Sequence, residues 1–536
     1  MKRPDHRERS PSGPAPAGSR AFLPYLIFTA ILCGALVMVI EILGSRVIGP
    51  FFGASLFVWT SLITVTLIAL AAGYAVGGIA SDRWASPAAL YSIILVAGVL
   101  VVFIPLLKAA VLKSALSWGL RGGALVSSFL LFGPSLLLLG CVSPYLVKIA
   151  AVEIRNIGRT VGVFYALSTV GSFLGTVLTG FFLIAYLPVS FIFTLIGALL
   201  IGLAAGYFLF FRRKVHALMI LILPFLLAPP GGQSTRLLAD GTRVTRVVDR
   251  DTYYGNLKVV DYSFGDKHHR DLLIDGLLQG GADMNSMQSL YDYSYFLEFL
   301  PYGMRPDGRS CLVIGLGAGL VPVWYENRGI RTDVVDIDPD IVSLAREYFG
   351  FKVSGSVYVE DARYFLNRTE NRYDYVVLDV FNGDTTPGHL LSREALQVLR
   401  ERMTARAVLA INLIGSLKND VFMTASVVKT LQQVFADVQI FPNYDVEREE
   451  GGGNITIIAS PAELPAMDAR RIVGLPVHPL AQAGVEQFLG RRYQIPDGTP
   501  AIVLTDDYNP IDFFDVRLKE WVRSMILKTS DEDMLI

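Results

Sequence analysis

Three glycines with alternate spacing follow an apolar run in the second half of the sequence. Gly315, Gly317 and Gly319 come after "CLVI" and precede a segment with helical periodicity. Glycines at a strand-to-helix turn let the backbone bend tightly and approach a ligand. Asp336 lies 21 residues after Gly315, at the end of the next predicted strand, where an acid can accept hydrogen bonds from ribose hydroxyls. This pattern predicts a nucleoside site, with a purely structural turn as the alternative.

The spacing of the glycines bears on which nucleoside is bound. Dinucleotide-binding loops have the pattern GxGxxG, whereas this loop is GxGxG and has Leu320 at the next position. The difference favours an adenosyl-sulfonium compound over a dinucleotide.

Further acids follow the third and fourth predicted strands. Asp361 in "YVEDARYFL" could hold an adenine amino group, or serve only as a helix N-cap. Asp379 ends the strand "YDYVVLDV", and the loop after it, residues 379–392, adds Asp384 and Pro387. Because the carboxyl ends of parallel strands meet at one edge of a sheet, we expect these acids to surround one cleft.

The elements that must position these residues alternate between strands and helices. We predict strands at 311–315, 331–338, 357–360, 373–380 and 406–413, with helices ending near 329 and at 339–349, 362–368 and 392–403. Strands separated by helices predict a parallel sheet of the Rossmann-like α/β class. Before it, "YGNLKVVDYS" (254–263) and "RDLLIDGLLQ" (270–279) alternate with a period of two and predict a small antiparallel β element.

The first half of the chain has a different composition. Apolar runs lie near 22–45, 55–79, 88–107, 123–147, 160–186 and 188–211. Each has about the 20 residues that cross roughly 30 Å of hydrocarbon, so we predict a multi-span helical membrane domain. A seventh run at 215–229 is shorter and contains a proline, and its crossing stays open.

Lysine and arginine are distributed unevenly around these runs. A disordered basic tail is predicted at 1–21, and on its side of the bilayer would also lie Arg83, Lys148, Arg155, Arg159, Arg212, Arg213 and Lys214. The other side would hold only Arg46, Lys108, Lys113 and Arg121. The positive-inside rule therefore predicts a cytoplasmic N terminus in an inner membrane. Because adenosyl-sulfonium compounds are cytosolic, we also expect the soluble half in the cytoplasm, although the basic residues before the seventh run favour a complete crossing.

Composition excludes several other classes. The net charge is −1 and basic residues form no stripe, so a nucleic-acid partner is not expected. The cysteines Cys33, Cys141 and Cys311 lie far apart in apolar runs and are predicted to fill the core. The six histidines show no zinc-site spacing, so no metal is expected.

Over roughly residues 250–460 the sequence resembles the spermidine synthase (polyamine aminopropyltransferase) family. The motifs that carry the resemblance are "RDLLIDGLLQ", "VIGLGAG", "VVDIDPDIVSLAREYF", "YVEDARYFL" and "YDYVVLDVFNGDTTP". The first half, with "GPFFGASLFVWTS", "GGIASDR" and "GVFYALSTVGSFLGT", is similar to bacterial proteins in which a transporter-like helical domain precedes a spermidine synthase-like domain. "LTDDYNP" at 504–510 resembles their C-terminal signature. The resemblance implies a class I methyltransferase-type fold and is compatible with assembly into homo-oligomers.

In that family an amine such as putrescine attacks decarboxylated S-adenosylmethionine. The resemblance implies that Asp336 binds ribose and that Asp361, Ala362 and Pro387 complete the nucleoside site with the three loop glycines. It also implies that an acid in the 379–384 loop is the base. Because this loop is one residue longer than the usual form, Asp379 and Asp384 are both candidates, and we choose Asp384 as the base and Asp379 as its support. Substrate-binding residues implied for the amine are Tyr254, Gln279 and Asp283.

The sequence departs from the family pattern at the amine-binding positions. An acid inside the glycine loop is replaced by Ala318, and a glutamine after Tyr254 by Gly255. The Asp-Glu pair expected after the hairpin is replaced by "GGADMNSMQSLYDY", which leaves Asp283 and Asp292 as nearby substitutes. We therefore expect an intact nucleoside site and an altered acceptor site.

Three functions follow from these patterns. The first is a membrane-bound aminopropyltransferase, and the second is a methyltransferase that uses intact S-adenosylmethionine. The third is a transporter or sensor in which the soluble half binds a nucleoside or polyamine. We predict domains at 22–230 (membrane), 231–300 (β element) and 301–520 (Rossmann-like), with a tail at 521–536.

Overall fold

The structure is a computed structural model of the whole chain. It describes residues 21–53, 56–153, 157–213, 235–381, 387–448, 451–511 and 516–529. The basic tail at 1–20, the seventh apolar run at 215–229 and Asp384 lie outside the described residues.

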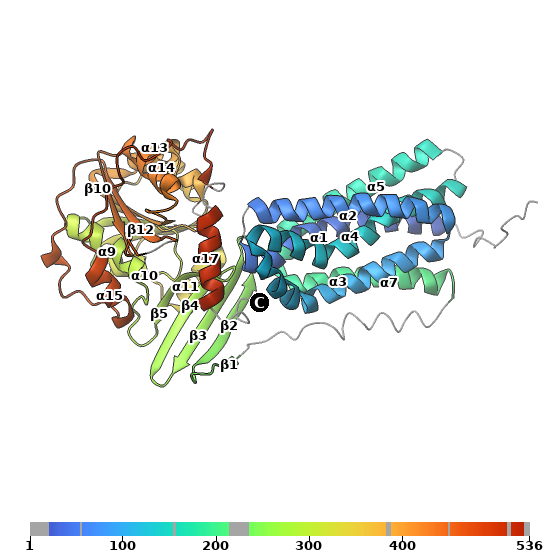
Figure 1. Cartoon of the computed structure of the whole chain (residues 1–536), viewed down its shortest axis with the longest axis horizontal. Helices are drawn as coiled ribbons and strands as arrows, with labels where there is room; N and C mark the ends of the chain where they lie inside the picture. The colour runs from blue at the N-terminus through green and yellow to red at the C-terminus, as the bar shows by residue number, and fades with distance from the viewer. Residues whose placement is uncertain are drawn as a thin grey trace, which may run out of the picture.

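Long helices form one bundle in the first half of the chain (Figure 1). They are α1 (Phe22–Phe52), α2 (Leu56–Arg83), α3 (Pro87–Ala115), α4 (Gly119–Glu153), α5 (Ile157–Leu178) and α7 (Val189–Phe210). Short pieces connect them: η1 (Leu116–Trp118) between α3 and α4, and η2 (Thr179–Leu183) with α6 (Ile184–Tyr186) between α5 and α7. These helices coincide with the apolar runs that the sequence predicts as spans.

Among the described residues, the bundle contains five continuous helical stretches that are long and apolar enough to cross a membrane. One of them, Pro87–Ala151, has 65 residues and comprises α3 and α4. Gly119 separates these two helices with a φ of 71°, a conformation that glycine adopts without a steric penalty. The long stretch therefore folds back as two antiparallel helices, which makes the arrangement compatible with the predicted spans.

Small residues allow two helix pairs in the bundle to approach closely. A β-carbon on Gly73 of α2 would lie 2.3 Å from the carbonyl oxygen of Leu137 in α4. A β-carbon on Gly171 of α5 would lie 2.0 Å from the carbonyl oxygen of Ile31 in α1. Packing of small residues against a neighbouring backbone is the usual basis of helix association in apolar surroundings.

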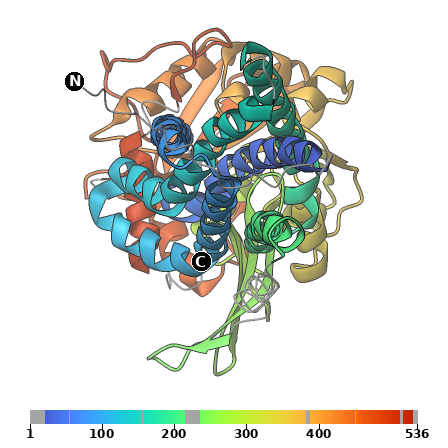
Figure 2. The same ribbon diagram turned by 90° about the vertical axis from the view of Figure 1, so that its right-hand side faces the viewer.

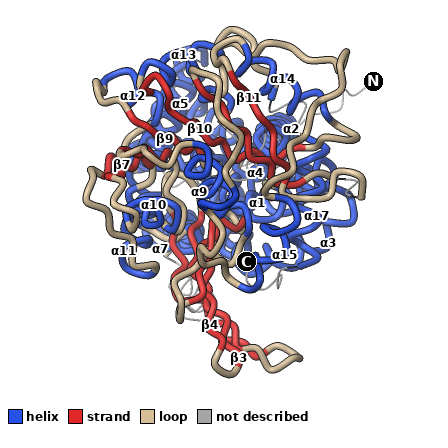
Figure 3. Tube along the Cα trace, turned by 90° about the vertical axis from the view of Figure 1, so that its left-hand side faces the viewer, coloured by secondary structure: helices blue, strands red, loops and turns tan. Residues whose placement is uncertain are grey.

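An antiparallel meander begins the second half. Its five strands, in spatial order, are β1 (Thr235–Leu237), β2 (Arg243–Asp251), β3 (Asn256–Phe264), β4 (Lys267–Ile274) and β5 (Leu277–Asp283). The segment "RDLLIDGLLQ" forms two strands because Asp275 and Gly276 both have positive φ, 48° and 74°, and make a tight hairpin turn. The meander projects from the rest of the molecule in Figures 2 and 3.

A seven-stranded sheet forms the core of the remaining chain. Its strand order is β11-β12-β10-β9-β6-β7-β8, and only β12 runs antiparallel to its neighbours. The strands are β6 (Ser310–Ile314), β7 (Arg331–Asp336), β8 (Val357–Val359), β9 (Tyr373–Leu378), β10 (Met403–Gly415), β11 (Asp437–Pro442) and β12 (Gly453–Ser460). This order confirms the predicted Rossmann-like α/β fold.

Helices cover both faces of this sheet, as the view in Figure 3 shows. They are α9 (Asp292–Met304), α10 (Leu320–Glu326), α11 (Pro339–Tyr348), α12 (Ala362–Arg368), α13 (Arg393–Glu401), α14 (Val421–Gln432) and α15 (Pro479–Phe488). The apolar residues on the two sheet faces form two separate buried clusters. Cys311 is buried in one of them, and Cys33 and Cys141 are buried in the helical half.

The two ends of this domain differ from the predicted boundaries. Helix α9 begins at Asp292 and packs with the seven-stranded sheet, although the sequence assigns it to the β element. The predicted tail from residue 521 contains most of helix α17 (Val516–Thr529). This segment is helical because Leu518 and Val522, four residues apart, are buried together against Leu277 of the meander.

The second half docks onto one end of the bundle (Figure 1). Tyr253 donates a hydrogen bond from its hydroxyl to the carbonyl oxygen of Phe181 at 2.7 Å. The amide of Val189, the first residue of α7, donates to Asp251 at 2.9 Å. At the other end of the bundle, Phe22 at the start of α1 contacts the ring of Phe211 just after α7. The second half therefore docks at the end of the bundle opposite to the start of α1.

Candidate active site

A cavity of about 1330 Å³ lies where the meander meets the carboxyl ends of β6, β7 and β9. It exceeds the roughly 300–1,000 Å³ typical of a site for one small molecule, so it has room for two substrates. Most of the residues predicted for the site line it: Tyr254, Gln279, Gly315, Gly317, Asp336, Asp361, Ala362, Asp379 and Pro387. Gly319 and Asp283 are not among the lining residues.

The glycine loop is shaped by its backbone geometry. Gly315, Gly317 and Gly319 have φ values of 88°, 52° and 79°, which residues other than glycine rarely adopt. A β-carbon on Gly315 would lie 2.0 Å from the carbonyl oxygen of Asp379. Gly319 instead faces Phe351 under the loop, where a β-carbon would lie 2.9 Å from that side chain. The first two glycines bring the backbone to the cavity, while Gly319 permits packing beneath it.

Both carboxylate oxygens of Asp336 accept backbone amides, one from the glycine loop and one from the turn after β7. Oδ2 accepts the backbone N–H of Leu316 at 2.8 Å, and Oδ1 accepts that of Asp338 at 2.9 Å. Burial raises its pKa to about 6, although these two hydrogen bonds act in the opposite direction. A carboxylate oxygen has two lone pairs, so each oxygen retains one acceptor position for a ligand hydroxyl.

Asp361 is the N-cap of helix α12. Its Oδ1 accepts the amide N–H of Tyr364 at 3.0 Å, and its Oδ2 lies 3.3 Å from Nε2 of His389. Asp361 therefore serves as a helix N-cap, as the structural alternative for this residue predicts. The same carboxyl group lines the cavity, so capping does not remove it from the site.

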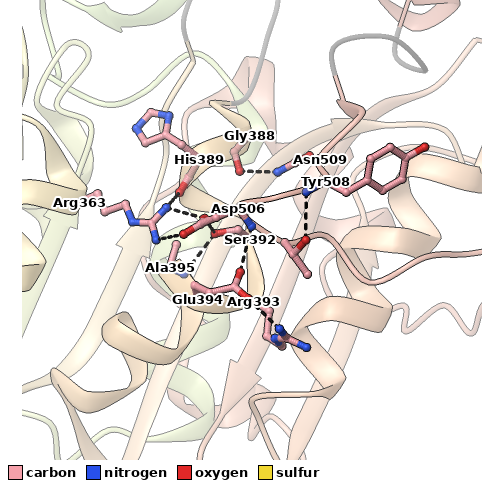
Figure 4. A network of polar contacts seen from close by, with 11 residues as sticks. Arg363, Gly388, His389, Ser392, Arg393, Glu394, Ala395, Asp506, Tyr508 and Asn509 are labelled. Atoms are coloured by element: carbon pink, nitrogen blue, oxygen red, sulfur yellow. Dashed lines mark hydrogen bonds and ion pairs between the residues drawn. The ribbon is translucent and has the colours of Figure 1, made fainter.

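The C-terminal signature "LTDDYNP" is bonded to Arg363 of helix α12 and to the segment that contains Gly388 and Ser392 (Figure 4). Asp506 pairs with the guanidinium of Arg363 and accepts a hydrogen bond from Ser392 at 2.5 Å. The pairing with Arg363 lowers the pKa of Asp506 to about 2. Asn509 donates to the carbonyl oxygen of Gly388 at 2.7 Å. The signature thus fixes residues 387–392 against helix α12 and the adjacent cavity.

Asp379 lies at the end of β9. Its Oδ1 accepts a hydrogen bond from Nδ2 of Asn412 on β10 at 2.9 Å. Burial raises its pKa to about 6, and the hydrogen bond from Asn412 partly offsets this effect. A carboxyl group with this pKa is mostly ionised at neutral pH and can accept a proton.

The two acids predicted as substitutes in the amine site differ in their positions, and the prediction for Asp283 needs correction. The Asp283 carboxylate turns away into the loop after β5, where it accepts hydrogen bonds from Ser286 at 2.7 Å and from the amide of Asn285 at 3.1 Å. Asp292 borders the cavity, but its carboxyl group lies beside α15: a β-carbon on Gly484 would come within 2.5 Å of Oδ2. Asp283 lies on the same face of the hairpin as Asp271 and Gly281, but two residues farther along β5, outside the lining of the cavity.

Three residues of the site are absent from the predicted set. Asp271 on β4 and the tyrosines Tyr291 and Tyr293 at the start of α9 line the cavity. The tyrosine hydroxyl of residue 291 donates to Oδ1 of Asp271 at 3.0 Å. Burial raises the pKa of Asp271 to about 7. The signal in the sequence was an aspartate inside the apolar strand "RDLLI", an unusual position for an unpaired acid.

Comparison with known proteins identifies the class of this domain. Residues 291–446 match the model of the spermine/spermidine synthase domain family. A polyamine aminopropyltransferase of Vibrio vulnificus is 32% identical over 175 residues, which cover 31% of this chain and 54% of that protein. An N-terminal histidine N-methyltransferase of Emericella nidulans is 34% identical over 139 residues, 25% of each chain.

Solved structures give similar matches. A probable spermidine synthase from Corynebacterium glutamicum aligns over 56% of this chain and 94% of its own, with 17% identity and a TM-score of 0.36. Human methyltransferase-like protein 13 in complex with SAH aligns over 38% of this chain and 93% of its own, with 22% identity and a TM-score of 0.28.

The C-terminal half is therefore similar to the spermine/spermidine synthase domain family over residues 291–446, and the resemblance stated from the sequence is confirmed for this region. The chain spans a quarter and about half of the lengths of the two curated relatives named above.

Proposed function

We propose that this domain transfers an aminopropyl group from decarboxylated S-adenosylmethionine to an amine. The observation that carries the proposal is the convergence of Asp336, Asp361 and Asp379 with the glycine loop on one cavity. In this reading Asp336 binds the ribose hydroxyls, and Asp361 with Ala362 and Pro387 contacts the adenine.

The reaction requires the amine to lose a proton. An acceptor arrives as an ammonium ion, and a carboxylate takes one proton from it. The free amine then attacks the methylene carbon next to the sulfonium, so that a C–N bond forms and the C–S bond breaks. The electron pair of the C–S bond stays on sulfur, which leaves as neutral methylthioadenosine, and the product is a secondary ammonium ion.

Two acids are candidates for this proton transfer. Asp379 is held by Asn412 and lines the cavity, which supports a role next to the reacting amine. Asp384, proposed as the base from the family resemblance, lies in the following loop outside the described residues. We propose Asp384 as the base and Asp379 as its support.

Product analysis tests this function. The purified full chain is incubated with a panel of amines and with decarboxylated S-adenosylmethionine labelled in the aminopropyl group. We expect label in a secondary amine, together with methylthioadenosine. Asp384→Asn should abolish transfer, whereas Asp379→Asn should reduce it, and unchanged transfer by Asp384→Asn would assign the base to another group. If no amine gives product although the donor still binds, the proposal is overturned.

Methyl transfer from intact S-adenosylmethionine is a second candidate. Ala318 stands where the family pattern has an acid that would bind the aminopropyl ammonium. In addition, the Emericella relative is named as a methyltransferase. The same incubation with S-adenosylmethionine labelled in its methyl group separates the two reactions. Methylated product without aminopropyl product would establish the second candidate.

We also propose that the helical half lies in a membrane. The apolar helical stretches support this, and the docking at one end of the bundle bears on orientation. Helix α1 begins at the end far from the C-terminal domain, so in a bilayer the start of α1 and the domain would lie on opposite sides. A cytoplasmic N terminus and a cytoplasmic domain, both expected from the sequence, are incompatible with this arrangement.

Reporter fusions test the orientation. Alkaline phosphatase, which is active only outside the cytoplasm, is fused before residue 21 in one protein and after residue 529 in another. We expect activity in one fusion only. Equal behaviour of the two fusions would overturn the proposed arrangement.

A further inference from the structure

Beyond the nucleoside end, the cavity is lined by the carboxylate of Asp271, by phenols and by apolar side chains, and Asp292 also borders it. They come from the meander, the start of α9 and helix α17: Asp271, Tyr291, Tyr293, Leu273, Leu277 and Trp521. Of the two acids predicted as substitutes for the amine, Asp283 does not line the cavity, and Asp292 borders it with its Oδ2 beside Gly484 of α15.

Asp271 has a hydrogen-bond donor beside its carboxylate but no cationic side chain among the described residues. Its Oδ1 accepts the hydroxyl hydrogen of Tyr291 at 3.0 Å. In the described part of the chain no cation pairs with this carboxylate, and its pKa is raised by burial. A partly buried carboxylate without a positive partner is stabilised when an ammonium ion binds beside it.

Two adjacent glycines make the room for this carboxylate. Gly281 lies opposite Asp271 in the β4–β5 pair, and a β-carbon on it would lie 2.0 Å from Oδ1. A β-carbon on Gly280 would lie 3.1 Å from the β-carbon of Ala318 in the glycine loop. Gly280 and Gly281 therefore leave room for Asp271 beside the glycine loop, in which Ala318 stands where the family pattern has an acid.

Tyr293 links this acid to the reacting end of the cavity. Burial raises the pKa of its hydroxyl, and the negative charges of Asp379 and Asp271 raise it further. Asp271, Tyr293 and Asp379 all line the same cavity. An amine bound at Asp271 would therefore share this cavity with Asp379.

The wall next to Asp271 is apolar. Leu273 lies two residues along β4, on the same side of the strand as Asp271. Leu277 packs with Val522 and Trp521 of α17, and Met525 completes the wall. These described wall residues include no acid, so a second ammonium on the same substrate would lose its hydration without gaining a partner.

We propose that the acceptor is a primary amine attached to an apolar body, with its ammonium group at Asp271 and its body against Leu273, Leu277 and α17. This inference rests on the proposed transferase function and names the substrate class of that site. A diamine or polyamine, which carries charge at both ends, is disfavoured by the same wall.

Two probes of equal length test the substrate class. Hexylamine and 1,6-diaminohexane share one carbon chain and differ in the second amine. Their binding to the full chain is measured by calorimetry in the presence of methylthioadenosine. We expect hexylamine to bind roughly tenfold more tightly or better, because no group offsets the desolvation of the second ammonium. Tighter binding of 1,6-diaminohexane would overturn the inference.

Variants locate the two parts of the subsite. Asp271→Asn keeps the shape of the side chain and removes its charge, and should weaken hexylamine binding roughly 10- to 100-fold. The matched control is Asp283→Asn, which alters a carboxylate of the same sheet that does not line the cavity and should leave hexylamine binding unchanged. Equal effects of the two substitutions would contradict the role of Asp271.

A gain of preference gives an independent test. Met525 on α17 is 45% exposed, so Met525→Glu places an acid on the apolar wall without a buried charge. This variant should shift the preference toward 1,6-diaminohexane, and an unchanged preference would show that α17 does not contact the acceptor. Methylthioadenosine binding is measured for every variant. If the wild-type protein does not bind methylthioadenosine, the proposed function itself is refuted. If it binds methylthioadenosine but shows no preference between the two amines, only this inference is refuted.

Discussion

Replacement of Asp336 by asparagine separates loop positioning from the rest of the nucleoside site. In the wild-type protein the two carboxylate oxygens accept the amide N–H groups of Leu316 and Asp338, at 2.8 and 2.9 Å. An asparagine side chain has only one oxygen, so its NH₂ group would face one of these N–H donors. One charge-assisted hydrogen bond is lost, and an N–H is left without an acceptor.

The magnitude follows from the energy of such a bond. Hydrogen bonds to charged groups contribute about 1.5–3 kcal/mol. If the ligand must restore the order of the loop, its affinity falls by the same free energy, which corresponds to roughly 10- to 150-fold. We therefore expect Asp336→Asn to weaken binding of methylthioadenosine by that factor in a calorimetric titration.

Asp361→Asn is the matched control. Asparagine caps helices about as well as aspartate, so the contact of residue 361 with the amide of Tyr364 survives the substitution. The variant should bind methylthioadenosine more tightly than Asp336→Asn does.

The pH dependence gives a second readout. Because burial raises the pKa of Asp336 to about 6, the carboxylate gains a proton as the pH falls through that value. Wild-type affinity should decrease over this range, and the affinity of Asp336→Asn should change less. The reasoning is refuted if Asp336→Asn binds like the wild-type protein above that pH.

Three further substitutions have defined outcomes. Gly315→Ala should abolish methylthioadenosine binding in calorimetry, because its β-carbon would lie 2.0 Å from the carbonyl oxygen of Asp379; retained binding would show that the loop can shift. Asp506→Asn should lower the thermal unfolding midpoint at neutral pH. Since its pKa is lowered from 3.8 to about 2, this contribution is present above pH 3.8 and lost as the pH falls toward 2, so the difference between the two proteins should narrow there; a constant difference would contradict the ion pair as its source. Arg523→Met should increase hydrogen exchange at the end of α1 and in the β4–β5 turn, whose carbonyl oxygens the guanidinium contacts at 3.0 and 2.8 Å; unchanged exchange at both places would show that the arginine does not hold them together.

The parallel sheet and the nucleoside end could be predicted because their signals are local. Each strand is a short apolar run that ends in an acid or a glycine, and the ends of neighbouring parallel strands meet at one edge. Gly315, Asp336, Asp361 and Asp379 are such positions, and all four line one cavity. Gly319 shares the motif but supports packing, a distinction that depends on the location of Phe351.

The acceptor end depends on pairing between strands, which a single sequence does not reveal. Asp271 has space only because Gly281 is its partner across the hairpin, and this register depends on the tight turn at Asp275 and Gly276. Asp283 follows the same hairpin in the sequence, but its carboxylate turns away from the cavity. Helix α17 escaped prediction because its few buried residues gain their partners from the meander, far away in the chain.

Arg523 gives the C-terminal helix two tasks at once. Its fully buried guanidinium binds the carbonyl oxygen of Pro50 in the bundle and that of Asp275 in the meander, while the neighbouring Trp521 and Val522 form part of the cavity wall. A C-terminal half produced without the helical bundle would lose the anchor at Pro50 and expose Arg523. Assays on such a fragment would report nucleoside binding faithfully and misstate which acceptors the intact protein selects.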